Sequence, residues 1–101
     1  LLHLVADVLE ALGNPRAVTL AQLITKAQDI HEWSFAEWLA DRKNRRQIPH
    51  RLESAGYGPV RNDASKDGLW VVKRKRQVIY APAALTIRDR IAAAHCLARD
   101  Q

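Results

Sequence analysis

Side chains able to contact the phosphates and base edges of a nucleic acid are concentrated in two segments of the chain. In the first, residues 42–57, the apolar residues Ile48, Leu52 and Ala55 are spaced as one face of a helix. Arginine can donate two hydrogen bonds to guanine, and asparagine or glutamine can pair with adenine. Donors and positive charges of this kind fill the other face of the segment: Lys43, Asn44, Arg45, Arg46, Gln47, His50 and Arg51.

The second segment is a run of four consecutive cations, Lys73 to Arg76. The β-branched and aromatic residues of 69–72 and 77–81 predict a strand on either side, and hence a hairpin with all of these cations at its tip. Adjacent positive charges repel one another unless an anion neutralises them, which favours contact with phosphates or a minor groove. Lysine at a hairpin tip can also protect a sheet edge from aggregation. Arg61 and Lys66 are expected to extend the same face.

The positive charge of the chain is unevenly distributed. The formal net charge is +5, but residues 42–76 hold eleven basic and three acidic residues, a balance of +8. Residues 1–41 hold two basic and six acidic residues, a balance of −4, and residues 77–101 hold three and two, a balance of +1. A basic surface confined to one part of the chain is typical of a domain that binds nucleic acid. The alternative is a solvated face without a ligand.

The chain before the first basic segment is predicted to be helical. Apolar residues recur at helical spacing over 2–12 and 20–29. A capping box at Thr19–Gln22 is expected to open the second of these helices, because the threonine hydroxyl and the glutamine side chain can satisfy each other's backbone N–H groups. A second capping box at Ser34–Glu37 predicts a helix of about 35–42.

A proline and a glycine bound the helix within the basic segment. Pro49 has no N–H to donate, so it is tolerated in the first turn only, and the helix is expected to begin no earlier than about Arg45 and as late as Ile48 or Pro49. Gly56 is well placed to end it in the left-handed conformation. A last helix, of about 87–99, follows the second predicted strand.

The order of elements predicts the fold class. Three helices, a basic helix, a β-hairpin and a final helix follow one another in a single domain over residues 1–101. A helix–turn–helix followed directly by a hairpin is the arrangement of a winged helix, with 35–42 and the helix near 46–55 as the helix–turn–helix and the hairpin as the wing. We therefore expect a mainly α fold with a small β-hairpin, an α+β winged helix–turn–helix.

The spacing of the last helix predicts that Ile87, Ile91, Ala94 and either Leu97 or Ala98 point inward. Cys96, the one cysteine of the chain, stands among these apolar residues and cannot form an internal disulfide. We therefore expect a buried, reduced thiol and a cytoplasmic protein.

Aromatic residues that interleave with basic ones can stack on the bases of a single strand. Phe35 and Trp38 have the spacing of core residues in a helix, and Trp70 that of a core residue in a strand. Tyr57 and Trp33 remain as stacking candidates.

No group of residues has the spacing of an active site or a metal centre. The four histidines lack partners at helical or cysteine-ligand spacing, and the four glycines form no phosphate-binding loop. Asp63 and Asp67 are turn formers first. We expect no catalytic residue, metal or cofactor, and no enzyme activity from the domain alone. No apolar run approaches the roughly 18 residues of a membrane helix, so no membrane partner is expected.

Five short stretches of the sequence resemble a known family when they are taken together. They are Arg45-Arg46-Gln47-Ile48-Pro49-His50-Arg51-Leu52-Glu53, Gly56-Tyr57, Pro59-Val60-Arg61-Asn62, Gly68-Leu69-Trp70 and Arg76-Gln77-Val78-Ile79-Tyr80-Ala81. Over about residues 17–95 the chain resembles a C-terminal module of phage- and plasmid-type primase–helicase replication proteins. The resemblance implies a winged-helix appendage that helps a larger enzyme bind DNA, with the polymerising or ATP-hydrolysing chemistry elsewhere in the parent protein. The chain begins with Leu rather than Met, and we expect it to be a fragment of such a parent.

The residues leave several functions open. Duplex DNA is the favoured partner, beside the remainder of the parent protein, and single-stranded DNA or RNA binding is an alternative. A module that binds another protein, or a dimeric transcriptional regulator, is a further alternative, because the acidic part of the chain could pack against a basic partner.

Overall fold

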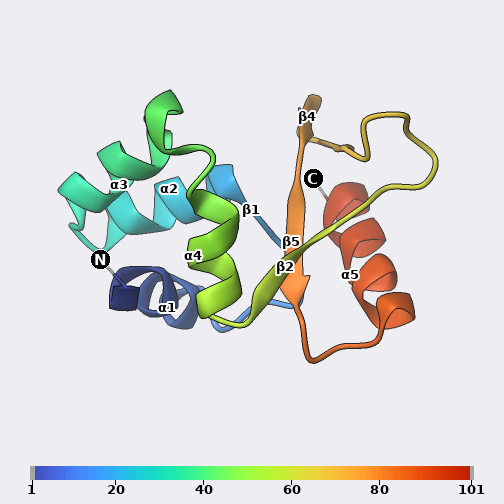
Figure 1. Ribbon diagram of the computed structural model, residues 1–101, viewed down its shortest axis with the longest axis horizontal. Helices are drawn as coiled ribbons and strands as arrows, with labels where there is room; N and C mark the ends of the chain where they lie inside the picture. The colour runs from blue at the N-terminus through green and yellow to red at the C-terminus, as the bar shows by residue number, and fades with distance from the viewer. Residues whose placement is uncertain (1, 101) are drawn as a thin grey trace.

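Five α-helices and short antiparallel strands follow one another along residues 2–100, the part of the chain that the computed structural model describes (Figure 1). This bears out the predicted mixture of helices with a small amount of β-structure. In chain order the elements are α1 (Leu2–Ala11), β1 (Val18–Thr19), α2 (Leu20–Asp29), α3 (Trp33–Ala40), the 3₁₀ turn η1 (Arg42–Asn44), α4 (Ile48–Ser54), β2 (Tyr57–Val60), β3 (Trp70–Val72), β4 (Lys75–Gln77), β5 (Ile79–Pro82) and α5 (Ile87–Asp100).

The strands form a three-stranded sheet and a separate hairpin, where the sequence predicted the hairpin alone. In the sheet β5 lies between β1 and β2, antiparallel to both, so that Tyr80 pairs with Val18 on one side and with Pro59 on the other. Strands β3 and β4 form the hairpin, and a single residue, Val78, separates β4 from β5. The predicted strand 77–81 therefore belongs to two different pairings.

The sheet divides the apolar core into two parts (Figure 1). On one side the helices α1 to α4 pack against each other and against the tyrosines of the sheet, with Leu9, Leu23 and Leu52 almost fully buried. On the other side α5 covers the sheet and the hairpin through Ala94, which has no exposed surface. The elements that carry the two basic segments therefore pack against a core of two parts.

The capping box before α2 is confirmed. The Thr19 hydroxyl accepts from the Gln22 N–H at 3.2 Å, and the Gln22 side chain accepts from the Thr19 N–H at 2.9 Å. The predicted capping box at Ser34 is wrong, because α3 already begins at Trp33 and its N-cap, Glu32, makes no side-chain capping bond. The cause lies in the end of α2: His31 has a φ of +62° and the Glu32 N–H donates to the carbonyl of Ala27 at 2.8 Å, which turns the chain into α3 early.

The predicted limits of α4 are confirmed. The helix begins at Ile48 with Pro49 in its first turn, and its N-cap is Gln47. Gly56 follows the helix with a φ of +85°, and its N–H donates to the carbonyl of Glu53 at 2.9 Å. Both limits follow from the backbone properties of these residue types: proline lacks an N–H, and glycine readily adopts a positive φ.

The hairpin has a shorter tip than the sequence predicted. Its register pairs Val72 with Lys75 and Val71 with Arg76, so only Lys73 and Arg74 form the turn. The prediction of four cations at the tip is therefore wrong, and the other two belong to β4. Lys73 and Arg74 have φ values of +51° and +67°. Two-residue hairpin turns require such positive values, because only these match the twist of the paired strands.

Two expectations for α5 are wrong. Ile87 remains 69% exposed, since it is the first residue of the helix. Cys96 is exposed, because Ala94 faces the sheet and a residue two positions further points to the far side of a helix. Ile91 does pack against the core, as predicted. The ring of His95 contacts the Trp70 ring edge-on, with 4.9 Å between the ring centroids.

Tyr57 is a structural residue, which contradicts its role as a stacking candidate. The side chain is buried at the start of β2, and its hydroxyl donates to the carbonyl of Pro15 at 2.6 Å. Burial raises the pKa of Tyr57 and of Tyr80 above the ordinary value. The bond joins the segment after α1 to the strand that follows α4.

A Tyr57→Phe variant should be less stable at neutral pH, by about 1 kcal/mol, because the Pro15 carbonyl loses its donor. The folded chain holds the tyrosine proton more tightly than the unfolded chain does. The resulting stabilisation is complete below about pH 10 and is lost as the pH rises through the raised pKa. Urea unfolding from about pH 8 to about pH 11 should therefore show a smaller loss in the variant than in the native chain. Equal losses in both would contradict this role of Tyr57.

Candidate nucleic-acid interface

The turn between η1 and α4 presents three of the predicted contact residues to solvent. Arg45, Arg46 and Gln47 are all exposed, and they precede α4 rather than forming part of it. Within residues 2–100 none of their side chains makes an ion pair or hydrogen bond with another side chain. These side chains remain available to a ligand.

The residues before this turn hold it in place. The Asp41 carboxylate accepts from the Lys43 N–H at 3.0 Å, which caps η1. The Asn44 side-chain amide donates to the carbonyl of Trp38 at 3.0 Å. Asn44 is therefore engaged with the end of α3, whereas the Lys43 side chain is exposed.

The two predicted contact residues within α4 differ in their surroundings. His50 is exposed, and its Nδ1 lies 3.9 Å from a carboxylate oxygen of Glu53. Arg51 is half-buried, with its guanidinium carbon 5.4 Å from the centre of the Trp38 ring. Such a cation–π contact ties α4 to α3, so Arg51 helps to position the helix.

The hairpin presents Lys73 and Arg74 at its exposed tip and Lys75 at the start of β4. Arg76 behaves differently, because its guanidinium lies 2.6 Å from a carboxylate oxygen of Asp67 and donates to the Ser65 hydroxyl at 2.9 Å. The run of four cations thus contains three with free side chains within the described residues and one fixed by the preceding loop.

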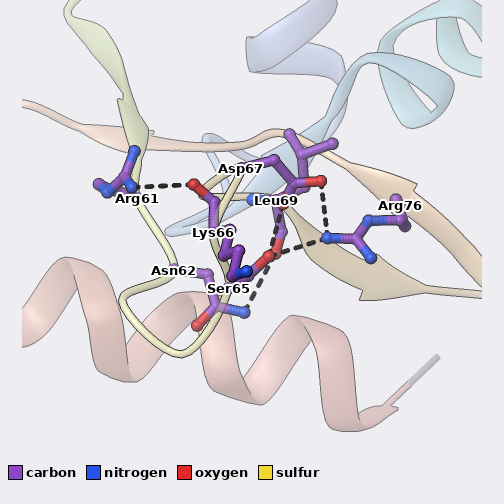
Figure 2. A network of polar contacts seen from close by, with 7 residues as sticks. All are labelled: Arg61, Asn62, Ser65, Lys66, Asp67, Leu69 and Arg76. Carbon is purple, nitrogen blue, oxygen red and sulfur yellow. Dashed lines mark hydrogen bonds and ion pairs between the residues drawn. The ribbon is translucent and has the colours of Figure 1, made fainter.

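A network of hydrogen bonds orders that loop, residues 61–69 (Figure 2). The Asn62 amide donates to the carbonyl of Leu69 at 3.1 Å, and the Leu69 N–H donates to Asp67 at 3.0 Å. The Arg61 guanidinium donates to the carbonyl of Lys66 at 3.2 Å, so this predicted contact residue is partly engaged as well. Its side chain also covers Gly68, where a φ of +73° and an approach of 3.0 Å between the Arg61 Cγ and an added Cβ favour glycine.

Asp67 belongs to the candidate interface in a way that the sequence does not predict, since its sequence context indicates a turn former first. The guanidinium of Arg76, the hydroxyl of Ser65 and the N–H of Leu69 hold the pKa of its carboxyl far below the usual range. Asp67 is therefore ionised at any physiological pH and keeps Arg76 in a fixed direction. No local signal reveals the pair, because nine positions separate the two residues and only the hairpin register brings them together.

Replacing Asp67 by alanine should loosen the loop without unfolding the domain. The Leu69 N–H would lose its acceptor and Arg76 its ion pair, so the amide of Leu69 should exchange with solvent several-fold faster. Asp63→Ala is a matched control, since Asp63 is an exposed acid of the same loop with no ion pair among the described residues. Hydrogen exchange followed by NMR measures both. The role of Asp67 is refuted if the two variants exchange alike.

Residues of both basic segments line one open groove. It lies between the start of α4 and strand β4, has a volume of about 570 Å³, and carries Arg45 on one wall and Lys75 and Arg76 on the other. Figure 1 shows the segment after α3 and strand β4 at the same edge of the molecule. We call this feature the basic groove. Most of the other lining residues are apolar and come from α2, α4 and the strands, among them Ala21, Ile24, Pro49 and Val78; Gln77 and Tyr80 add an amide and a hydroxyl.

The described residues contain no group of three or more histidine, cysteine, aspartate or glutamate side chains that could hold a metal ion. No helix within residues 2–100 is long and apolar enough to cross a membrane.

Comparison of the chain with protein-family models, with curated proteins and with solved structures gave no match. The resemblance to replication proteins therefore remains a prediction from the sequence. The geometry of the site is the main support for a function.

Proposed function

We propose that this chain is a winged-helix domain that binds duplex DNA. The single observation that carries the proposal is the basic groove, which is lined both by Arg45 of the turn before α4 and by Lys75 and Arg76 of the hairpin. In a helix–turn–helix, the start of the second helix contacts the bases of the major groove. If α3 and α4 are the first and second helices of the motif, the exposed turn of Arg45 to Gln47 lies at the end of α4 that would contact the bases.

The topology supports the same proposal. Strand β1 lies between α1 and α2, and the connection from β2 to β5 contains the hairpin β3–β4, which would serve as the wing. The exposed cations Lys73 and Arg74 at the hairpin tip would contact the backbone or the minor groove. Arg51 and Asn44 would act indirectly, since they fix α4 and the preceding turn against α3.

A salt titration tests this function. If about five phosphates are neutralised, the logarithm of the binding constant should fall with the logarithm of salt concentration at a slope of about −4 to −5 on duplex DNA. Fluorescence anisotropy of a labelled oligomer measures the slope. An affinity that does not depend on salt, or no binding to duplex DNA at low salt, would refute the proposal.

As part of this proposal, the domain has no catalytic activity by itself and serves a larger replication protein of the primase–helicase kind as a DNA-binding module. The support for this is the sequence resemblance. It implies that the remainder of that protein is the second partner of the domain.

A second candidate function is favoured by Trp33, which is 57% exposed at the start of α3. The ring of His31 lies beside it, with 5.8 Å between the ring centroids. Exposed tryptophan is over-represented among the residues that dominate protein–protein binding. Under this alternative the face around Trp33 binds a protein, and a Trp33→Ala variant should lose that assembly while DNA binding persists.

A further inference from the structure

We propose that the basic groove binds an unpaired nucleotide, so that the preferred substrate is a DNA duplex with a single-stranded end. This inference rests on the proposed DNA-binding function and narrows it to one class of DNA. The juxtaposition of an apolar floor with a cationic rim carries it.

The floor of the groove has the wrong chemistry for a phosphate backbone and the right chemistry for a base. Ala21 and Ile24 of α2, Pro49 of α4 and Val78 between the strands make up most of it, beside the polar groups of Gln77 and Tyr80. A phosphate placed against the apolar residues of this lining would lose water without gaining hydrogen bonds. The face of a base is apolar and gains from contact with apolar side chains once it leaves the stack.

The size of the groove fits the same occupant. Its volume of about 570 Å³ lies within the range of about 300–1,000 Å³ that holds small ligands. A double helix is far too large to enter such a space, so a duplex could only lie across its mouth. An unpaired nucleotide at the end of that duplex can enter.

The charges on the rim complete the site. Arg45 stands on the wall formed by the turn before α4, and Lys75 on the opposite wall formed by β4. Both side chains are exposed, and neither has an ion pair within residues 2–100. Arg76 is held at the rim by Asp67 and Ser65. A base on the floor would therefore have cations on both sides for the phosphates that flank it.

Three DNA ligands of the same duplex test the inference: one with blunt ends, one with a three-nucleotide overhang, and one whose overhang is abasic. We expect the native chain to bind the duplex with the intact three-nucleotide overhang about tenfold more tightly than the blunt duplex. This is the gain expected from one base bound in the groove. The abasic overhang should lose this preference, because it keeps the phosphates and lacks the base. Equal affinity for blunt and overhanging DNA, or an unchanged preference for the abasic strand, would overturn the inference.

A variant that fills the floor provides the second arm. Ala21 is exposed, so Ala21→Trp should fold normally, and it should abolish the overhang preference, measured as the ratio of the affinities for overhanging and blunt DNA. Ala92→Trp, at an exposed helix position on α5, is the matched control and should keep the preference. Ala21→Glu tests the same floor with a smaller residue. If both Ala21 variants keep the overhang preference, the inference is wrong. If the native chain does not bind blunt duplex DNA at all, the proposed function itself is refuted.

Discussion

The variant that carries Arg45→Glu together with Arg46→Glu is expected to lose duplex DNA binding by at least about 100-fold. Each change removes a cation that could contact a phosphate and puts a negative charge in its place, which repels the backbone. Both side chains are exposed in the turn before α4, and no bond within residues 2–100 depends on them. The fold should therefore survive, and the melting temperature should stay close to that of the native chain.

A control of equal net charge separates location from overall charge. Arg16→Glu with Arg88→Glu changes the total charge by the same amount, at exposed residues that do not line the basic groove. Titration of a labelled duplex at fixed salt measures both variants. If the control loses as much affinity as the test variant, binding reflects net charge rather than this surface. If DNA binding survives the change at Arg45 and Arg46 while an assembly fails, the protein-binding alternative is correct.

Replacing Lys73 by asparagine and Arg74 by glycine is expected to raise stability and weaken DNA binding at once. Both residues have positive φ values, which strain side chains of this kind. Asn-Gly is the preferred pair for such a turn, so the free energy of unfolding should rise by about 1–2 kcal/mol. The loss of two tip cations should make the salt slope less negative by about two and lower the affinity about tenfold or more at low salt.

An alanine pair at the same positions separates the two effects. Lys73→Ala with Arg74→Ala removes the same charges but leaves the backbone strain, so it should lose affinity without gaining stability. Urea unfolding and the salt titration measure both outcomes. Unchanged DNA affinity in both pairs would show that the hairpin tip makes no contact with DNA.

The sequence by itself determined the features that depend on chemistry within a few residues. The apolar spacing of α2, its capping box at Thr19 and the limits of α4 at Pro49 and Gly56 all agree with the structure. In each case the backbone groups involved lie within about one turn of the residue that satisfies them, so the pattern is complete in the local sequence. The concentration of positive charge in one part of the chain was visible for the same reason, since it requires only counting.

Tertiary structure alone decided which of those charges remain free. The register of β3 and β4 limits the hairpin tip to two cations and directs Arg76 to Asp67. The packing of α4 on α3 places Arg51 over the Trp38 ring, and the fold brings the Tyr57 hydroxyl to the carbonyl of Pro15. These contacts join residues distant in the sequence, so no periodicity encodes them. The sequence around a charged residue does not reveal whether its side chain faces solvent or pairs with another residue. Only the packing of the elements distinguishes exposed charges from paired ones.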